Sequence, residues 1–365
     1  MNIRDKNLYY IGGIVRDEIL GIKSFDVDLT YVGDAIEFAK GLDGVEILQI
    51  NEPFGTVKIK SGEEEIDIAS TRSELYPQKG HLPVVEKIAC SLKEDVLRRD
   101  FTINALAKST LTGEITDYTG GLKDIESKTL RILHDESFID DPTRIIRGLK
   151  FAVRFGFELD EHTKKLQDDY LAHINYDMSK KRIKKELEET FSLNSQEAFN
   201  KFVNQKIYKL ITQQNFNLPD VNFEELINKY KPENVWIIYA GQIPDIENLP
   251  LTKSEKKIVE CFRQLFEKSY NTDFEIYKSF ESVPVESVVM FASKNYNSVL
   301  KYLDSLRYIK PQISGKTLIE HGIEPSDKFG QCFDYIVEQK LKKQNMTFQE
   351  ETELAKNFFR GIKTL

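Results

Sequence analysis

The pattern of apolar residues changes at about residue 136, and this change most constrains how the chain can fold. Before it, residues 26–31, 56–60 and 65–69 have the alternating pattern of strands, and residues 34–43 read as a helix between two of them. After it, apolar residues recur at helical spacing and few strand signals remain. We therefore predict an α+β protein, in which a head with a small mixed sheet and helices precedes an all-α remainder.

The chain has 365 residues, which is long for a single core. Four prolines between residues 215 and 250 mark turns within the helical part. We expect four consecutive parts: a catalytic head over 1–135, a helical neck over 136–210, a helical body over 211–305 and a helical tail over 306–365.

Charge and composition restrict the setting of the protein. The 51 basic and 59 acidic residues give a net charge of −8, which argues mildly against a nucleic-acid partner, although the groups that touch phosphate decide. No apolar run is long enough to span a membrane, and no signal peptide is apparent. Three widely spaced cysteines favour a reducing cytoplasm. No protein partner is implied.

The first group of residues suited to chemistry begins after a short β-like run at Tyr9-Tyr10-Ile11. Gly12 and Gly13 precede a helix start, where bare backbone N–H groups can approach phosphate oxygens. Asp26 and Asp28 alternate along a strand, so both project from the same face. Paired carboxylates suit one or two Mg²⁺ ions, yet Asp-x-Asp is also common on surface strands.

A third carboxylate can join this pair. Asp67 lies between Ile66 and Ile68, so it faces away from them on its strand. Metal-assisted phosphoryl transfer needs such a cluster. The alternative is an acid on an edge strand that faces solvent.

Two further segments combine arginine with acids. Arg98 and Arg99 could clamp phosphate or pair with acids, and Asn104 could hydrogen-bond a ribose hydroxyl. Asp141 and Pro142 read as a helix start, with Asp141 as the N-cap and Pro142 as the first helical residue. Arg144 follows one turn later, and a carboxylate beside a guanidinium can read the Watson–Crick edge of a base.

These segments, in this order, resemble the class II tRNA nucleotidyltransferases, which belong with the bacterial poly(A) polymerases. The resemblance rests on Gly12 to Asp17 with Asp26-Val27-Asp28, on Arg98 to Ala105, and on Asp117-Tyr118-Thr119-Gly120-Gly121. The family's nucleotide-selecting motif, Glu-Asp-x-x-Arg, stands here as Asp140 to Arg144, with Asp140 in place of the glutamate. Arg72 to Tyr76 resembles an Arg-x-Glu-x-Tyr element at the start of a loop that some members use in switching from C to A addition.

The resemblance implies roles for individual residues. Catalysis falls to Asp26, Asp28 and Asp67, with Mg²⁺ bound by Asp26 and Asp28. The implied nucleotide-binding residues are Gly12, Gly13, Arg16, Arg98, Asp100, Asn104, Asp141, Arg144 and Arg147. CTP and ATP are the implied nucleotides and the tRNA 3′ end the implied acceptor.

The resemblance continues beyond the head. Ser179 to Leu187 is similar to the family's neck element, and its basic cluster is either a tRNA contact or a solvated helix face. Residues 313–325 look like the tail segment that holds tRNA. The implied tRNA-binding residues are Lys180, Lys181, Arg182, Lys184, Gly315 and Lys316.

The implied reaction is template-independent addition of C, C and A to the tRNA 3′ end with release of pyrophosphate. Three alternatives stay open. A poly(A) polymerase shares the head motifs, although residues 51–57 look like the CCA-adding type. A partial enzyme would add only CC or only A. A non-catalytic tRNA-binding protein would not need Asp26, Asp28, Asp67 and Arg144.

Overall fold

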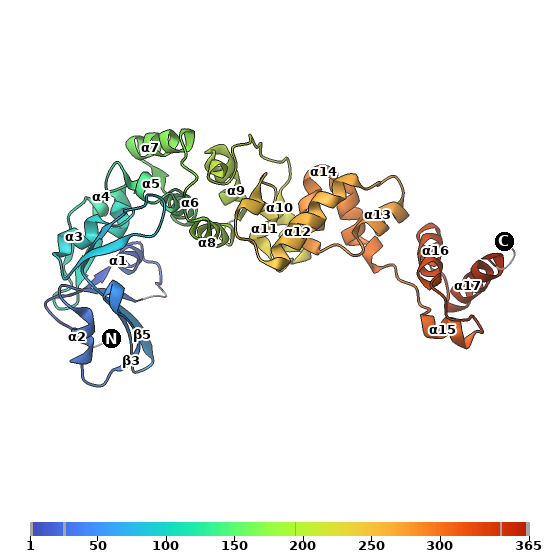
Figure 1. Cartoon of the computed structure of the whole chain (residues 1–365), viewed down its shortest axis with the longest axis horizontal. Helices are drawn as coiled ribbons and strands as arrows, with labels where there is room; N and C mark the ends of the chain where they lie inside the picture. Colours follow the sequence, from blue (N-terminus) through green and yellow to red (C-terminus); the bar gives the residue numbers. More distant parts are fainter. Residues whose placement is uncertain (1–2, 25–26, 194, 344, 363–365) are drawn as a thin grey trace. The chain divides into compact units, whose positions relative to one another are not determined.

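The computed structural model describes residues 3–24, 27–193, 195–343 and 345–362. The chain forms two compact units (Figure 1): the first comprises residues 1–218 and 243–250, and the second comprises residues 219–242 and 251–365. This division is coarser than head, neck, body and tail, so those four boundaries stay a prediction. Within the described residues no helix combines the length and apolar composition needed to cross a membrane.

A seven-stranded mixed sheet is the centre of the first unit. Its strand order is β3-β4-β5-β2-β1-β8-β9, and among the described strands of this sheet only β2 and β5 pair in parallel. The mixed sheet and the helical remainder confirm the predicted fold class. The strands are β1 (Leu8–Ile11), β2 (Asp28–Tyr31), β3 (Glu46–Asn51), β4 (Thr56–Ser61), β5 (Glu64–Ser70), β8 (Leu106–Ser109) and β9 (Ile115–Asp117).

The two faces of the sheet have separate cores because side chains alternate along each strand. On one face, Leu29, Ile66 and Ile68 are buried together with Ala35 and Ala39 of helix α2 (Ala35–Lys40). On the other face, a second cluster joins Ile11, Ala105 and Ala107 to Leu92 and Val96 of α3 (Leu92–Leu97). The second face is also the one toward which Asp28 and Asp67 point, since both alternate with core residues.

The first unit also contains short helices and two small ribbons beside the sheet. Its remaining helices are α1 (Gly13–Ile19), α4 (Gly121–Glu126), α5 (Ser137–Asp140), α6 (Thr143–Phe155), α7 (Glu161–Ala172), α8 (Lys180–Phe191) and α9 (Ser195–Asn204). The ribbons are an antiparallel pair, β6 (Arg72–Leu75) with β7 (Val84–Ile88), and a parallel pair, β10 (Thr129–Leu130) with β11 (Glu158–Leu159).

The described residues of the second unit form helices and loops, with no strand among them. Its helices are α10 (Phe223–Tyr230), α11 (Val235–Ala240), α12 (Lys253–Gln264), α13 (Asp273–Phe280), α14 (Val285–Asp304), α15 (Gly315–Glu320), α16 (Phe329–Lys342) and α17 (Phe348–Ile362). Six 3₁₀ turns occur among the described residues of the two units: Glu52–Phe54, Thr102–Asn104, Ile207–Leu210, Ile246–Asn248, Leu265–Glu267 and Leu306–Tyr308. Ile313, Leu318, Cys332, Ile336 and Ala355 form a separate small core for the last three helices.

Candidate functional site

Two of the three predicted catalytic carboxylates lie side by side on the sheet. β2 and β5 pair in parallel with Asp28 directly opposite Asp67. Ile66 and Ile68 are fully buried on the opposite face, as the alternating pattern predicts. Both aspartates are exposed, and 57% of the Asp67 side chain is accessible. Both side chains therefore reach solvent.

The donor set of this pair fits a hard cation. Asp26 lies outside the described residues, and no group of three metal-binding side chains converges within the described ones. Asp28 and Asp67 nevertheless offer carboxylate oxygens, which Mg²⁺ prefers. The ammonium group of Lys58, which is on the neighbouring strand β4, lies 3.3 Å from Asp67 Oδ2. It partly compensates the negative charge of the Asp67 carboxylate.

The Gly-Gly turn is built for close approach of other groups. Gly12 has φ +72° between β1 and α1, a conformation that favours glycine. A Cβ at this position would lie 3.0 Å from Nη1 of Arg99. Arg99 pairs with the fully buried Asp95, while its own Nε is buried without a hydrogen-bond partner among the described residues. A guanidinium beside a glycine turn is suited to an anionic ligand.

Arg98 has acidic partners rather than an open face. Its guanidinium lies 2.9 Å from Asp95 Oδ1 and 2.9 Å from Glu74 Oε1. Arg72 also pairs with Glu74, so the two arginines share one carboxylate. The sequence left open whether Arg98 clamps phosphate or pairs with acids, and in the structure it pairs with acids.

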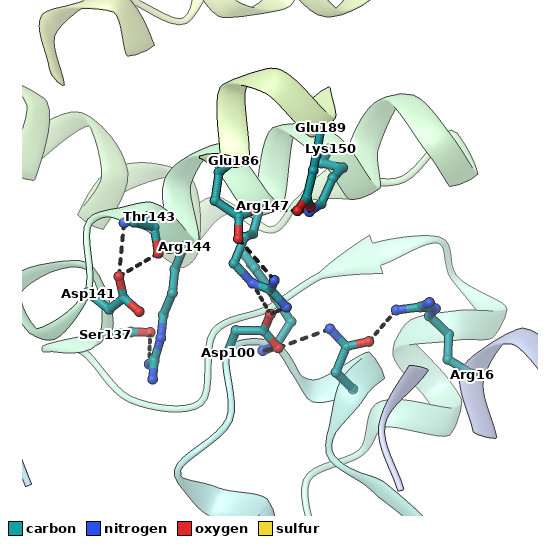
Figure 2. Close-up of polar contacts among 12 residues, drawn as sticks. Arg16, Asp100, Ser137, Asp141, Thr143, Arg144, Arg147, Lys150, Glu186 and Glu189 are labelled. Atoms are coloured by element: carbon teal, nitrogen blue, oxygen red, sulfur yellow. Dashed lines mark hydrogen bonds and ion pairs between the residues drawn. The ribbon is translucent and has the colours of Figure 1, made fainter. Parts of the chain in front are cut away.

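A buried polar network joins four of the predicted nucleotide-binding residues (Figure 2). Arg16 donates to the side-chain oxygen of Asn104, and the Asn104 amide donates to Asp100 Oδ1 over 3.0 Å. Arg147 of α6 reaches Asp100 Oδ2 with Nε at 2.8 Å and Nη2 at 2.6 Å. It also contacts Glu186 of α8, which pairs with a lysine. The network therefore ties α1, the 102–104 turn and two neck helices together.

The charges in this network shift the titration of its members. Burial by itself raises the pKa of Asp100, but the Arg147 guanidinium and the Asn104 amide outweigh it and hold that pKa well below its usual range. Burial lowers the pKa of Arg16, although its hydrogen bond to Asp17 acts to raise it.

Lys150 pairs with Glu186 and Glu189, and Arg154 lies 3.5 Å from Asp17. The basic side chains Arg147, Lys150 and Arg154, which recur along α6, are thus each matched by an acid.

The predicted base-selecting pair lies on one turn at the start of α6. Asp141 Oδ1 accepts hydrogen bonds from Thr143, through the backbone N–H at 3.1 Å and the hydroxyl at 2.5 Å. Asp141 thus contacts the first turn, but the predicted N-cap position is wrong by one residue: α6 begins at Thr143 and its N-cap is Pro142, which has no side-chain cap hydrogen bond. Arg144 Nη1 donates to Ser137 Oγ over 2.7 Å, as Figure 2 shows. Both side chains are almost fully buried.

Groups that the sequence did not link to Arg144 hold it in place. Its Nη2 donates to the backbone oxygen of Arg98 over 3.0 Å and to the Tyr76 hydroxyl over 3.2 Å. His134 Nε2 lies 3.4 Å from Nη1. Tyr76 belongs to the Arg-x-Glu-x-Tyr element, which was the available signal, whereas Ser137 and His134 belong to no motif that we identified.

The basic cluster on α8 does not act as one surface. Lys180, Lys181 and Lys185 are exposed, but Lys184 is buried and pairs with Glu188. Arg182 turns inward and contacts Asp141. The structure therefore separates these predicted tRNA-binding residues, and Lys180 and Lys181 stay candidates for phosphate contact.

The predicted tail residues lie in the second unit. Gly315 opens α15 behind a Ser314 cap, and Lys316 is 86% exposed at its side chain. Lys316 is accessible to phosphate, and its nearest acid is Glu320 at 3.8 Å.

Comparison with known proteins identifies the head. Residues 8–131 match the poly A polymerase head domain. An A-adding tRNA nucleotidyltransferase from Aquifex aeolicus is 48% identical over 164 residues, which are 43% of this chain and 20% of that protein. This chain thus spans only about a fifth of that relative.

Two other relatives align along most of both chains. The A-adding tRNA nucleotidyltransferase of Halalkalibacterium halodurans is 27% identical and covers 97% of this chain and 89% of its own. The CCA-adding enzyme of Lactobacillus helveticus is 28% identical, and the alignment covers 90% of this chain and 88% of that protein.

Solved structures share the fold. The Thermotoga maritima CCA-adding enzyme complexed with tRNA superimposes with a TM-score of 0.76 at 23% identity, covering 96% of this chain and 91% of that one. A tRNA-processing enzyme with CTP has a TM-score of 0.67 at 25% identity, covering 92% and 97%.

Proposed function

Because this chain carries a poly A polymerase head domain and is homologous to A-adding and CCA-adding tRNA nucleotidyltransferases over nearly its whole length, we propose that it adds C, C and A to the 3′ end of tRNA without a nucleic-acid template. The substrates are CTP, ATP and a tRNA that lacks part or all of its terminal CCA. A cytoplasmic location belongs to the same proposal, in keeping with the three unpaired cysteines Cys90, Cys261 and Cys332.

The observation that carries the proposal is the turn that holds Asp141 and Arg144. Cytosine and adenine both present an amino donor beside a ring-nitrogen acceptor, whereas uracil and guanine present the reverse. Asp141 accepts from the amino group and Arg144 donates to the ring nitrogen. Their near-complete burial supports discrimination, because a wrong base leaves buried groups unpaired.

The reaction needs a site for the triphosphate beside the carboxylates. The tRNA 3′-hydroxyl oxygen forms a bond to the α-phosphorus, the bond from that phosphorus to the bridging oxygen breaks, and pyrophosphate leaves with the electron pair. The Gly12-Gly13 backbone and the Arg99 guanidinium beside it are suited to the triphosphate.

Asp26 and Asp28 would hold Mg²⁺, with Asp67 as the third carboxylate. When bound there, the ions supply Lewis-acid activation of the attacking hydroxyl and neutralise charge on the departing pyrophosphate. The exposed, in-register Asp28 and Asp67 carboxylates support this assignment.

A second candidate is addition of the terminal A alone. It is favoured by the relatives from Aquifex aeolicus and Halalkalibacterium halodurans, both of which are A-adding tRNA nucleotidyltransferases. The head, however, is also shared with CCA-adding enzymes, so the two candidates need a product assay.

The test supplies four tRNAs, which end before the CCA, after one C, after both Cs and after the complete CCA, with CTP, ATP or both. A CCA-adding enzyme completes the first three and leaves the fourth unchanged. Addition confined to the CC-ended tRNA identifies an A-adding enzyme, and long A tails identify a poly(A) polymerase. Binding without extension identifies a non-catalytic tRNA-binding protein. Asp28→Ala is the control, since its loss of extension with retained tRNA binding ties the product to this site.

A further inference from the structure

Arg182 differs from the other basic residues at the start of α8 in the direction of its side chain. Lys180, Lys181 and Lys185 are exposed, whereas the Arg182 side chain is 27% accessible. Its Nη2 lies 2.5 Å from Asp141 Oδ2 and 3.3 Å from Thr143 Oγ1. A guanidinium in this position is not directed at an RNA backbone in solution.

The contact decides which acceptor site Asp141 can offer. A carboxylate has about four lone-pair sites, two on each oxygen. The backbone N–H and hydroxyl of Thr143 occupy both sites of Oδ1. Arg182 occupies one site of Oδ2. One acceptor site on Oδ2 therefore remains, and the position of Arg182 determines which of the two sites it is.

Arg182 is itself held by the loop between β6 and β7. Its Nη1 donates to the backbone oxygen of His81 over 3.4 Å. Gly80 connects this loop to both Asp140 and the start of α8. Its backbone N–H donates to the backbone oxygen of Asp140 over 3.0 Å, and its backbone oxygen accepts from the Ser179 N–H over 3.0 Å. Lys79 pairs with Asp140 through its side chain. The base-selecting turn and the first turn of α8 are thus fixed against the same loop.

Close packing makes this arrangement specific. Gly80 has φ +81°, and a Cβ there would lie 2.9 Å from the backbone oxygen of Asp177. Asp177 in turn accepts from Gln78 over 3.1 Å and lies 3.0 Å from His81 Nε2. The loop has little freedom to shift relative to α8, so the Arg182 guanidinium has a defined position.

We propose that Arg182 is a positioning residue for nucleotide selection: it orients the Asp141 carboxylate toward the amino group of the incoming cytosine or adenine, and it does not bind tRNA phosphate. This inference rests on the proposed function, because it assigns Asp141 to the base. It moves Arg182 from the tRNA-binding set, where its sequence neighbours placed it, to the nucleotide site.

The experiment compares Arg182→Ala and Arg182→Lys with Lys181→Ala, a matched control that removes an exposed positive charge from the adjacent position of the same helix. Three quantities are measured for each variant: the KM for CTP and ATP, the fraction of UTP and GTP incorporated, and tRNA affinity as a function of salt. Thermal unfolding midpoints establish that each variant is folded.

Loss of a charged hydrogen bond to Asp141 is expected to raise the nucleotide KM of Arg182→Ala on the order of tenfold and to increase misincorporation. Arg182→Lys should recover part of the loss, because an ammonium keeps the charge but not the geometry. The salt dependence of tRNA binding should stay at the parent value. In Lys181→Ala, the nucleotide KM and the misincorporation should stay at the parent values, whereas the salt dependence of tRNA binding should change.

A double-variant measurement keeps the inference falsifiable even where Arg182→Ala is poorly active. If Arg182 acts through Asp141, adding Arg182→Ala to Asp141→Ala should change nucleotide KM and base preference little beyond Asp141→Ala alone. Additive effects overturn the inference, as does a reduced salt slope in Arg182→Ala with unchanged nucleotide KM. A parent protein that extends no tRNA overturns the proposed function instead, so the two failures are distinguishable.

Discussion

At the scale of single residues, the surroundings of Arg144 are the most informative feature of the site. Both terminal nitrogens of its guanidinium have partners, namely Ser137, Tyr76, His134 and the Arg98 backbone oxygen. The Tyr76 ring also lies 5.9 Å from the guanidinium carbon. A side chain held from so many directions would lose little conformational entropy on binding a base as we propose.

Replacing Arg144 tests the base-reading pair directly. We expect Arg144→Ala to use CTP and ATP roughly tenfold to a hundredfold less efficiently and to reject UTP and GTP less well, because the ring nitrogen loses its donor. Single-nucleotide incorporation with each of the four triphosphates measures this, with exposed Lys185→Ala as the control. An unchanged preference in both Arg144→Ala and Asp141→Ala would reduce the pair to a helix cap.

His134 makes this part of the protein sensitive to acid. Burial lowers its pKa, as does the neighbouring Arg144, and these effects outweigh Asp140 and Glu136, which raise it, while Lys79 lowers it further. The folded protein therefore takes up this proton at lower pH than the unfolded chain. The stability that His134 contributes is present above its ordinary pKa of about 6.5 and falls as the pH drops from there to the lowered folded value.

Below that lowered pKa, the protonated His134 places a positive charge next to Arg144. We expect the KM for CTP and ATP to rise on acidification and this rise to be smaller in His134→Asn, which cannot titrate. Initial rates between pH 5 and 8, with saturating tRNA, provide the comparison. Equal pH profiles for the parent and the variant would rule out His134 as the titrating group.

At the scale of elements, the segment from Asp117 to Gly121 holds the 102–104 turn that carries Asn104. The Asp117 carboxylate accepts from the backbone N–H groups of four residues at 2.9 to 3.1 Å: Thr119, Gly120, Gly121 and Leu122. Burial alone raises the pKa of Asp117, but these four donors lower it overall. A Cβ at Gly121 would lie 2.2 Å from the Thr102 backbone oxygen. This motif thus has a structural role.

The two adjacent glycines of this segment should respond differently to alanine. Gly120 has φ +81° with open space around it, so Gly120→Ala is expected to lower the free energy of unfolding by about 1 to 2 kcal/mol through backbone strain alone. Gly121→Ala should cost more, about 3 kcal/mol or above, because a backbone oxygen must move. Urea unfolding followed by circular dichroism measures both, and equal losses would contradict the packing argument.

At the scale of the whole molecule, the tail has a core of its own within the second unit. Glu351 is fully buried, pairs with Lys340, and accepts from the backbone N–H of Gln312 over 2.6 Å. Lys278 of α13 pairs with Asp334 of α16. The last three helices therefore share one small core, and an ion pair joins them to α13.

Shortening the chain before Ile313 should raise the KM for tRNA more than the KM for ATP. The removed helices carry exposed Lys316, and we expect Lys316→Ala in the full-length chain to reproduce a small part of the effect, with a shallower salt dependence of tRNA binding. Steady-state kinetics with each substrate varied in turn separates the two constants. Equal increases in both would point to a general loss of folding, which the unfolding midpoint would reveal.

The sequence by itself determined the fold class, the approximate positions of β2, β4 and β5 and the exposed faces of Asp28 and Asp67, because alternation and helical spacing are local properties of a chain. Only the tertiary structure placed Asp28 opposite Asp67, since strand register depends on which segments pair. It also gave Arg98 its partners Asp95 and Glu74.

The basic cluster shows the same limit most clearly. Its spacing defines a helix with two faces, but the sequence leaves open which face is covered. The Arg182 guanidinium turns to Asp141, about forty residues earlier, and Lys184 is buried, while Lys181 stays in solvent. A local pattern fixes the geometry of a helix, and the partner that lies against it fixes the role of each side chain, because burial and ion pairing are properties of the contact.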